Sequence, residues 1–481
     1  MGRGNLYQWS VFLNLLVIGL MIAASLGTWL FRQHRLNALL VISVLALYAL
    51  QPAGSGGLEI ALPTATILLV LGAWWLTAPA PSRGDGSTLL LIVAAAVLVP
   101  LLSTIIDGSL FRQIILVPPF LAALAAGTLA VGTLTRTEDD AARHRLALAF
   151  VGLIVLLLVV IKMPALQRAF TQAWTDITRQ PSFPGWQWLG FSYVAFRLMH
   201  VLLDYRSGRL KPVRLRDFAL YVVFYPALAA GPIDRVEHFT RELGQPRARS
   251  AEALTSGAIR IARGLLKKFV LADSLAYLAL NPQLVAQTTG PYRTISTWLM
   301  VYAYAFQIYL DFSGYTDVAI GIGQLAGIRL PENFTTPYLK RNITAFWNSW
   351  HITLSTWFRN YFFTPFSRSL MQTPLRERRL LIILVAQVST MVLIGLWHGI
   401  ALNFVLWGAW HGVGLWLNRW LVDQTRGWND YVQSRPRLAQ AMNVLSIVTT
   451  FHFVAVGWIF FALPDMGLIG KALAGLVGLG G

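Results

Sequence analysis

Three histidines that each follow a tryptophan lie within one stretch of the chain, between Tyr338 and His411. They are His351, His398 and His411, and glycine follows the last two. Imidazole is the side chain that ordinarily changes charge near neutral pH, so it can take up and return a proton. Such a ring at the border of an apolar run indicates a lined interior site. Alternatively, the rings anchor helix ends at a membrane interface, beside aromatic belts.

A polar run follows the first of these histidines and strengthens the case for a lined site. Its members are Ser355, Thr356, Arg359 and Asn360. The wider stretch from Trp347 to Phe363 is too polar to face lipid and too apolar to be a water-exposed loop. A half-inserted segment that lines a cavity satisfies both constraints.

Two carboxylates, Asp311 and Asp317, lie beside Ser313 at the end of an apolar run. A carboxylate at membrane depth is costly unless it is paired or hydrated, so both are expected to face the interior or an interface. With Ser313 they could hold a cation, but the spacing is a weak metal signal and we assign no metal site. A break in the helix, capped by Asp or Ser, explains these residues equally well.

The composition indicates whether the chain lies in water or in a membrane. Of its 481 residues, 56% are hydrophobic and only 12% are charged. A soluble domain carries about 25% charged residues, so we expect a polytopic membrane protein. The net charge of +18 comes from short loops between apolar runs, which is typical of cytoplasmic loops beside anionic lipid and predicts no nucleic-acid partner. The absence of cysteine excludes disulfides, thiolate metal ligands and a cysteine nucleophile.

Apolar runs predict a series of membrane-spanning helices. They lie near residues 11–31, 38–50, 60–78, 88–105, 114–132, 146–165, 189–203, 269–283, 294–311, 380–396, 400–421 and 442–463. When the early spans alternate in direction, the basic loops at 32–35, 136–145 and 206–216 all fall on one side, which the positive-inside rule assigns to the cytoplasm. The first run is too long for a cleavable signal peptide.

Other stretches do not fit full spans. Residues 218–230 are apolar but few, and Gly231-Pro232 follows them, which favours a re-entrant hairpin. Within residues 235–268, basic residues recur at helical spacing, which predicts an interfacial amphipathic helix or a solvated loop helix. The basic residues of this stripe are Arg260, Arg263, Lys267 and Lys268. Residues 167–188 are expected to lie outside, on the interface.

Several motifs together resemble the membrane-bound O-acyltransferases. They are Phe346-Trp347-x-x-Trp350-His351 with Ser355 and Arg359, Gly395-Leu396-Trp397-His398-Gly399, Trp407-Gly408-x-Trp410-His411-Gly412, Tyr309-x-Asp311-Phe312-Ser313-Gly314, Glu332-Asn333-Phe334 and Tyr225-Pro226. The similarity covers roughly residues 190–461 and is greatest to a bacterial branch that contains the alginate O-acetylation membrane subunit and the teichoic acid D-alanyl transfer protein. The chain differs from the family pattern at Asn348 and Ser349, where basic residues are usual, and at Asn360, where an acid is usual.

The resemblance implies a fold and a set of site residues. The fold would be an all-α polytopic membrane fold, with extra transmembrane helices in residues 1–180 and a catalytic core with re-entrant segments and a central tunnel in residues 181–481. His398 would be the general base, and His351 would orient the substrate or stabilise the oxyanion. Tunnel-lining or substrate-binding roles would fall to Trp350, Ser355, Trp397, Asn348, Arg359, Asp311, Ser313, Asp317 and His411, although His411 could be purely structural.

The resemblance also implies a reaction. An acyl group, most simply acetyl, would pass from a cytoplasmic thioester, acetyl-CoA or an acyl carrier protein, to hydroxyls of a cell-surface polysaccharide, directly or through an extracytoplasmic acetyltransferase. No bound cofactor is expected, and the chain would lie in the bacterial inner membrane. D-alanyl or longer acyl groups are alternatives. A transporter or a non-enzymatic subunit of a polysaccharide export system would share the composition, but a transporter tends to show internal repeats and we find none.

Overall fold

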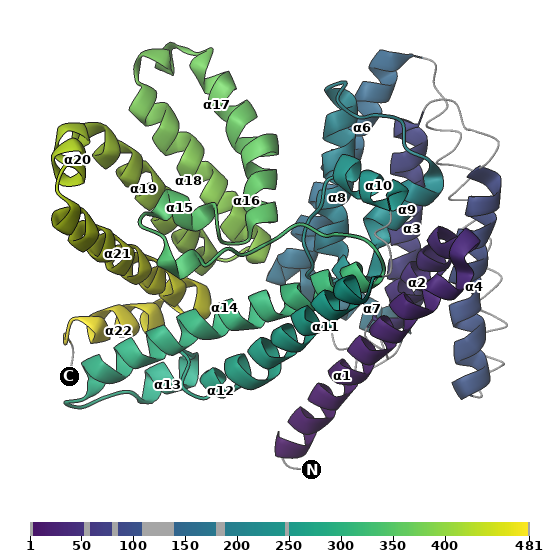
Figure 1. Ribbon diagram of the computed structural model, residues 1–481, viewed down its shortest axis with the longest axis horizontal. Coiled ribbons are helices and arrows are strands. Elements are labelled where there is room, and N and C mark those ends of the chain that lie inside the picture. The colour runs from purple at the N-terminus through teal and green to yellow at the C-terminus, as the bar shows by residue number, and fades with distance from the viewer. Residues whose placement is uncertain are drawn as a thin grey trace. The chain divides into compact units, whose positions relative to one another are not determined.

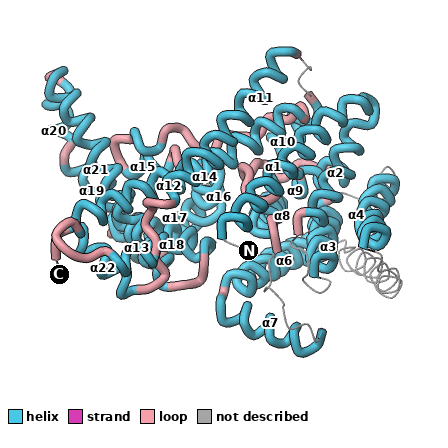
Figure 2. The backbone as a smooth tube through the Cα atoms, turned by 90° about the horizontal axis from the view of Figure 1, so that it is seen from below, coloured by secondary structure: helices cyan, strands magenta, loops and turns pink. Residues whose placement is uncertain are grey.

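The computed structural model describes residues 3–51, 58–78, 85–107, 139–178, 188–245 and 250–479. Every regular element within these ranges is a helix, and none of these residues forms a strand (Figures 1 and 2). In the described part, five helical stretches are long and apolar enough to cross a membrane: Asn14–Phe31, Ile60–Thr77, Asp140–Lys162, Arg379–His398 and Pro436–Ala462. The all-helical prediction is therefore confirmed. The span predicted at 114–132 lies outside the described residues.

The chain packs as two units, each with its own core. The first comprises Met1–Ala262 with Asp317–Pro331, and the second comprises Arg263–Thr316 with Glu332–Gly481. The histidine-rich stretch lies entirely within the second unit. The division that the sequence predicts after residue 180 rests on where motifs occur, and it stays a prediction.

In the first unit, the helices follow the apolar runs closely until the chain reaches residue 215. They are α1 (Arg3–Gly27), α2 (Arg35–Ala49), α3 (Leu58–Thr77), α4 (Asp85–Asp107), α6 (Asp140–Lys162), α7 (Pro164–Thr178), α8 (Phe191–Arg206), α9 (Leu215–Val223) and α10 (Val236–Gly244). Helix α9 has nine residues, so at 1.5 Å per residue it is about 13 Å long and cannot cross a bilayer of about 30 Å. This length agrees with the prediction that residues 218–230 make no full span.

A buried arginine explains how the irregular segment after α9 can lie inside the protein. The helix ends at Val223, a single 3₁₀ turn follows at Tyr225–Ala227, and Gly231 approaches Ala227 so closely that a Cβ atom would lie 2.4 Å from its Cα atom. Arg197 of α8 is 2% exposed and donates hydrogen bonds to the carbonyls of Val222 (2.8 Å), Ala227 (2.8 Å) and Pro232 (3.4 Å). Buried carbonyls outside a helix need such partners.

Helices α11 (Ala251–Leu265) and α14 (Arg293–Leu325) correct two predictions. The chain after residue 268 does not begin a separate span, because α11 continues through a π-helical segment (Leu266–Ala272) into α12 (Asp273–Ala276). Helix α14 also runs unbroken through residues 311–317, where a helix break had been one explanation of the polar residues. The sequence-based boundaries fail here because an apolar stretch marks burial or lipid contact and does not itself mark where a helix starts.

Ion pairs supply the partners that the two carboxylates of α14 require. In the second unit, Lys268 Nζ lies 2.5 Å from Asp311 Oδ1, and in the first unit Arg260 Nε lies 3.1 Å from Asp317 Oδ1. Close helix contact permits these pairs, since a Cβ atom on Gly314 would lie 2.8 Å from the Gly264 carbonyl oxygen. Two cations of the predicted amphipathic stripe thus face a neighbouring helix.

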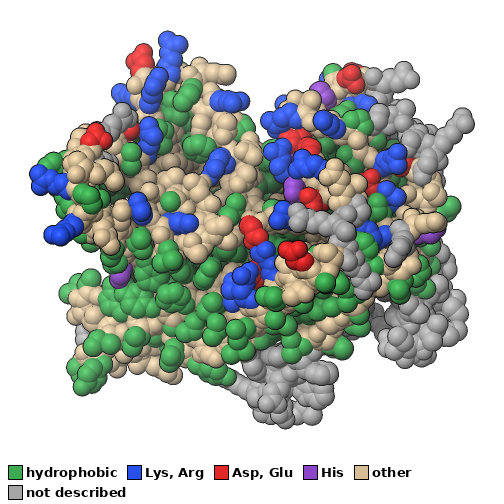
Figure 3. Space-filling view, in the orientation of Figure 1, with side chains coloured by type: hydrophobic (Ala, Val, Ile, Leu, Met, Phe, Trp, Pro, Cys, Tyr) green, Lys and Arg blue, Asp and Glu red, His purple; other side chains and the backbone are tan. Residues whose placement is uncertain are grey.

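The second unit is built from short helices followed by long ones. Its elements include α13 (Pro282–Gln287), α15 (Ile343–Trp347), α16 (Ile352–Phe358), a π-helical turn (Arg359–Phe363), α17 (Thr364–Met371), α18 (Arg379–His398), α19 (Leu402–Gln424), α20 (Arg426–Gln433), α21 (Pro436–Ala462) and α22 (Met466–Leu476). Hydrophobic side chains cover its surface over α12 to α14 and α22 (Figure 3), among them Tyr292, Ile295 and Leu299. An apolar surface of this kind suits contact with lipid.

Replacing Arg197 with lysine should destabilise the protein strongly. Lysine has one terminal nitrogen, which cannot take the positions of both Nη1 and Nη2 of Arg197, so at least one buried acceptor loses its partner, at a cost of about 1–3 kcal/mol. We expect the midpoint of thermal unfolding of the purified protein to fall by several degrees. The matched control is Arg206→Lys on the same helix, since Arg206 is exposed and its replacement should leave the midpoint unchanged. Equal midpoints for the two variants would contradict the proposed role of Arg197.

Candidate active site

An antiparallel hairpin of α18 and α19 carries two of the three histidines. Glycines bring the two helices into backbone contact: a Cβ atom would lie 2.2 Å from the Phe404 carbonyl oxygen at Gly395, 2.5 Å from the Met391 carbonyl oxygen at Gly408, and 2.6 Å from the Val388 Cα atom at Gly412. Small residues at such positions allow helices to pack closely in a membrane. Gly412, which follows His411, is one of these glycines.

His398 is the last residue of α18, at the end of the span where the sequence places it. Its ring is half-buried among aromatic side chains. The ring centroid lies 4.6 Å from that of Trp397, 4.8 Å from that of Phe461 and 5.7 Å from that of Trp407. These rings from α18, α19 and α21 fix the orientation of the imidazole, while its partial exposure leaves room for another molecule to reach it.

His351 adopts a backbone conformation that is rare for its residue type. Its φ is 43° and its ψ is 53°, the left-handed region, immediately before α16. This conformation costs roughly 1–2 kcal/mol in a residue with a Cβ atom and marks a site held by its surroundings. The ring is 2% exposed, and neither of its nitrogens has a hydrogen-bond partner in the described part of the chain. A buried imidazole with two unused nitrogens is suited to bind a substrate group.

Asn333 holds the backbone at His351, a role that the sequence alone did not reveal. Its backbone carbonyl accepts from the Ile352 amide (3.0 Å), and its side-chain oxygen accepts from the Thr353 amide (3.2 Å) and the Thr353 hydroxyl (2.6 Å). Asn333 is completely buried. The motif Glu332-Asn333-Phe334 had signalled the family, and its asparagine is here a positioning residue for the left-handed turn.

Trp397 lies beside both predicted catalytic histidines. Its ring centroid is 6.2 Å from that of His351 and 4.6 Å from that of His398. The structure thus brings the two imidazoles to the same tryptophan, although 46 residues separate them in the chain. Trp397 therefore links the surroundings of the two histidines.

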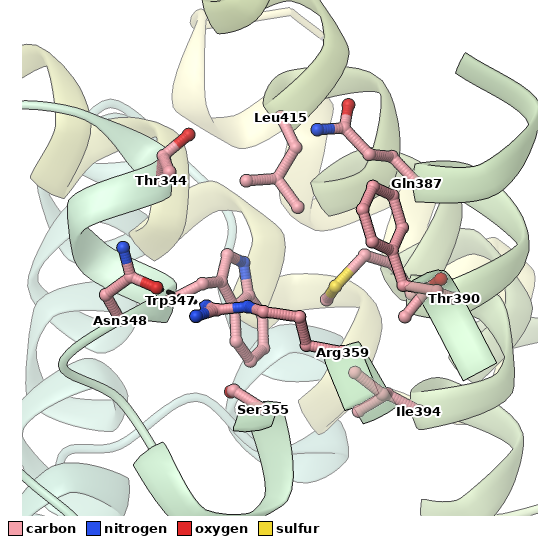
Figure 4. A pocket seen from close by; sticks show the side chains of 11 residues that line it. Thr344, Trp347, Asn348, Ser355, Arg359, Gln387, Thr390, Ile394 and Leu415 are labelled. Atoms are coloured by element: carbon pink, nitrogen blue, oxygen red, sulfur yellow. Dashed lines mark hydrogen bonds between the residues drawn. The ribbon is translucent and has the colours of Figure 1, made fainter. Parts of the chain in front are cut away.

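A pocket of about 250 Å³ opens next to these residues (Figure 4). It is lined by Thr344, Trp347, Asn348, Ser355, Arg359, Phe363, Gln387, Thr390, Met391, Ile394 and Leu415. The predicted lining residues Asn348, Ser355 and Arg359 therefore share one cavity. This volume is below the range of about 300–1,000 Å³ for drug-sized ligands, so the pocket would hold one part of a substrate.

The pocket reaches to within one helical turn of each catalytic candidate. Ile394 lies four residues before His398 on α18, and residues four apart share a helix face. Ser355 lies one turn after His351, as its amide donates to the His351 carbonyl (3.0 Å). Neither histidine is among the residues that line the pocket, so a continuous tunnel through both stays a prediction.

The other predicted site residues lie in different surroundings. His411 is completely buried, with Trp407, Trp347 and Phe453 around its ring, and like His351 neither of its nitrogens has a hydrogen-bond partner in the described residues, so both roles considered for it stay predictions. Trp350 packs in an aromatic cluster with Phe346. The α14 residues Asp311, Ser313 and Asp317 are not among the pocket residues either, and both carboxylates are already engaged in ion pairs.

The first unit contains a separate cluster of titratable groups that sequence reasoning missed. His200 Nε2 lies 3.0 Å from Asp204 Oδ2, and Arg209 and Arg235 also pair with Asp204. Nearby, burial raises the pKa of Asp234, and the hydrogen bond from His238 to this carboxylate (2.8 Å) raises the pKa of His238. The i, i+4 spacing of His200 and Asp204 on α8 could have signalled this cluster. Its two arginines already neutralise the carboxylate.

The fold is that of a helical protein with helices long and apolar enough to cross a membrane, and two of its histidines lie beside one tryptophan. The sequence pattern of the membrane-bound O-acyltransferase (MBOAT) family matches residues 186–453, more than half of the chain and all three histidines. The chain belongs to this family. The polytopic membrane fold predicted from the motifs is that of the family.

Curated relatives are similar over more than half of the chain. The chain is 35% identical over 280 residues to the probable alginate O-acetylase of Pseudomonas aeruginosa (58% of this chain, 49% of that protein). It is 30% identical over 278 residues to the teichoic acid D-alanyltransferase of Bacillus subtilis (57% and 68%) and 33% identical over 270 residues to the peptidoglycan O-acetyltransferase of Helicobacter pylori (55% and 47%). The chain spans about half the length of the alginate O-acetylases that it matches.

Removing the side-chain acceptor of Asn333 should impair catalysis through His351. In Asn333→Leu the Thr353 amide and hydroxyl lose their partner, so the left-handed turn relaxes and the imidazole moves; a displacement of about 1 Å can lower the rate about 100-fold. Asn333→Asp keeps the accepting oxygen and serves as the matched variant. We expect acyl-transfer activity to fall in the leucine variant and to be largely retained in the aspartate variant. Full activity in both would show that the turn does not depend on Asn333.

Proposed function

We propose that the enzyme moves an acetyl group from a thioester in the cytoplasm to hydroxyls of a cell-surface polysaccharide, directly or through an extracytoplasmic acetyltransferase. The observation that carries this proposal is that His351 and His398 both lie beside Trp397, each within one helical turn of a residue that lines the pocket. The relatives support it, because those named above act on alginate, teichoic acid or peptidoglycan. The location that follows is a bacterial cytoplasmic membrane.

The two imidazoles divide the work of acyl transfer. His398, half-buried at the end of α18, takes the proton of the acceptor hydroxyl as its oxygen attacks the thioester carbonyl. A protonated nitrogen of His351 donates a hydrogen bond to the carbonyl oxygen while negative charge develops there. The carbon–sulfur bond then breaks, the ester forms, and the thiolate recovers the proton from His398. The chain has no cysteine, so the acyl group cannot be carried on a cysteine thiol. This favours direct transfer from the thioester to the hydroxyl.

The charge of the pocket favours acetyl over D-alanyl. Of the residues that line it, Arg359 is the one with a formal charge at neutral pH, and none is acidic. A D-alanyl group carries an ammonium, which a nearby guanidinium repels and which no carboxylate in the lining would neutralise. An acetyl group carries no charge and meets no such penalty.

His398→Ala should lower acetylation by about 100- to 10,000-fold, the contribution of a general base. The measurement is mass spectrometry of the O-acetyl content of envelope polysaccharide, in cells that produce each variant at equal membrane levels. His351→Ala should lower it by about 100- to 1,000-fold, as expected for loss of an oxyanion hydrogen bond.

His452→Ala is the matched control, because His452 lies in the same unit but pairs with Tyr302 (2.8 Å) away from the pocket. Its acetylation should stay close to that of the unaltered protein. Full acetylation in cells that produce His398→Ala would contradict the proposal. It would indicate that the protein is a non-catalytic subunit of a polysaccharide export system. If the polysaccharide carries D-alanyl esters in place of acetyl esters, the proposed acyl group is wrong but the proposed mechanism stands.

A further inference from the structure

Three aromatic rings in the interior of the second unit contact one another. Trp347 ends α15, and Trp407 and His411 lie four residues apart in α19. The ring centroids of Trp347 and Trp407 are 5.7 Å apart, and that of His411 lies 5.3 Å from Trp347 and 5.1 Å from Trp407. All three side chains are buried. We call these three residues the ring triangle.

The nitrogen atoms of the ring triangle have no hydrogen-bond partner in the described part of the chain. They are Trp347 Nε1, Trp407 Nε1, and Nδ1 and Nε2 of His411. Buried polar groups are nearly always hydrogen-bonded, because an unpaired one costs the free energy of removing it from water. His411→Phe would keep a ring of similar size without this cost. The unpaired nitrogens therefore indicate a polar occupant.

The kinds of nitrogen identify this occupant. An indole nitrogen can only donate a hydrogen bond, whereas a neutral imidazole has one nitrogen that donates and one that accepts. The ring triangle thus presents more donors than acceptors, and hydrogen bonds between its own rings would leave donors unused. A water oxygen can accept two N–H groups while an O–H group donates to the imidazole. Buried waters typically make about three such hydrogen bonds to groups that are otherwise unpaired.

Other occupants fit the ring triangle less well. The further rings around His411 are those of Phe346, Phe453 and Trp458, and these carry no charge that would hold an anion. A cation would face the indole N–H groups, which repel it. An N–H group that rests on the face of a neighbouring ring makes only a weak contact, and it leaves the accepting nitrogen of His411 without a donor.

The ring triangle lies between the pocket and His398. Trp347 lines the pocket (Figure 4), and the ring centroid of Trp407 lies 5.7 Å from that of His398, at an interplanar angle of 85°. Gly457 of α21 leaves room for the third ring, since a Cβ atom there would lie 2.8 Å from His411 Nε2. A hydrogen bond at Trp407 Nε1 would fix the ring against which His398 packs.

We propose that the ring triangle binds one buried water molecule, which accepts from the indole N–H groups of Trp347 and Trp407 and donates to the accepting nitrogen of His411. His411 is then a positioning residue: through the water it orients Trp407, and Trp407 orients the ring of His398. The water site follows from the ring contacts and the unpaired nitrogens, whereas its effect on acetyl transfer rests on the proposed function.

Radiolytic labelling of the full chain in lipid nanodiscs tests the water site directly. X-ray pulses convert ordered water into hydroxyl radicals, which oxidise the side chains beside it, and mass spectrometry locates the products. Trp407 should be oxidised although it is only 1% exposed. The internal control is Trp74, which is 4% exposed and whose Nε1 donates to the Val213 carbonyl (2.9 Å), and it should stay unoxidised. If Trp407 resists oxidation as Trp74 does, the proposal is overturned.

Two variants separate a hydrogen-bonding role of His411 from a packing role. His411→Phe keeps a ring but removes both nitrogens, so oxidation of Trp407 should be lost. Acetyl transfer should fall by up to about 100-fold, the cost of displacing a catalytic group by about 1 Å. His411→Gln keeps a donor and an acceptor and should retain the oxidation and most of the transfer. A packing role predicts the reverse order, because phenylalanine fills an aromatic interior better than glutamine does.

His452→Phe is the matched control, because His452 pairs with Tyr302 (2.8 Å) outside the ring triangle, and it should change neither result. Oxidation of Trp407 that persists in His411→Phe overturns the role of His411. The comparison of Trp407 with Trp74 in the unaltered protein needs no variant, so it holds even if His411→Phe does not fold. Oxidation of Trp407 in a protein whose acetylation does not depend on His398 would support the water site and contradict only the proposed function.

Discussion

Backbone contact between α18 and α19 is the constraint on which the site depends. Gly395, Gly408 and Gly412 leave no space for a Cβ atom between the helices, and any larger residue there would push them apart. Their contact sets the level of His398 at the end of α18 and brings Phe404 and Trp407 against its ring. It also orders the pocket, because the residues of α18 that line it, from Gln387 to Ile394, lie along this hairpin. The glycines therefore act on the chemistry without touching a substrate.

In both units, a single buried side chain holds an irregular segment by forming hydrogen bonds with its backbone. Arg197 binds carbonyls of the last turn of α9 and of the segment after it, and Asn333 holds the turn at His351. In a regular helix the backbone N–H and C=O groups form hydrogen bonds with each other. Where the chain leaves the helix, these groups need another partner, and one side chain supplies it in each case. At His351 this departure directs an imidazole with two unused nitrogens into an aromatic interior. In the segment after α9 it allows the chain to turn inside the protein.

The sequence predicted long apolar elements and the chemistry-bearing motifs, but not the contacts between distant segments. The span at 380–396 and the end position of His398 agree with α18, because a run of apolar residues with a polar end is a local signal. The sequence analysis missed that α11 continues into α12 and that α14 continues through Asp311. The charged residues at these places are neutralised by partners on another helix. Lys268 lies 43 residues from Asp311 in the chain, and neither residue alone shows that the other neutralises it.

The differences from the family pattern gain meaning only from side-chain contacts. Asn348 occupies a position where basic residues are usual, and the structure places it against Arg359 as a hydrogen-bond acceptor. A basic residue could not accept from the guanidinium and would repel it, so Arg359 would have to point elsewhere. Asparagine thus lets a single arginine extend across the pocket with its charge unneutralised, whereas an acidic partner would have cancelled that charge. The exchange of a basic residue for a neutral amide keeps one well-oriented cation at the pocket.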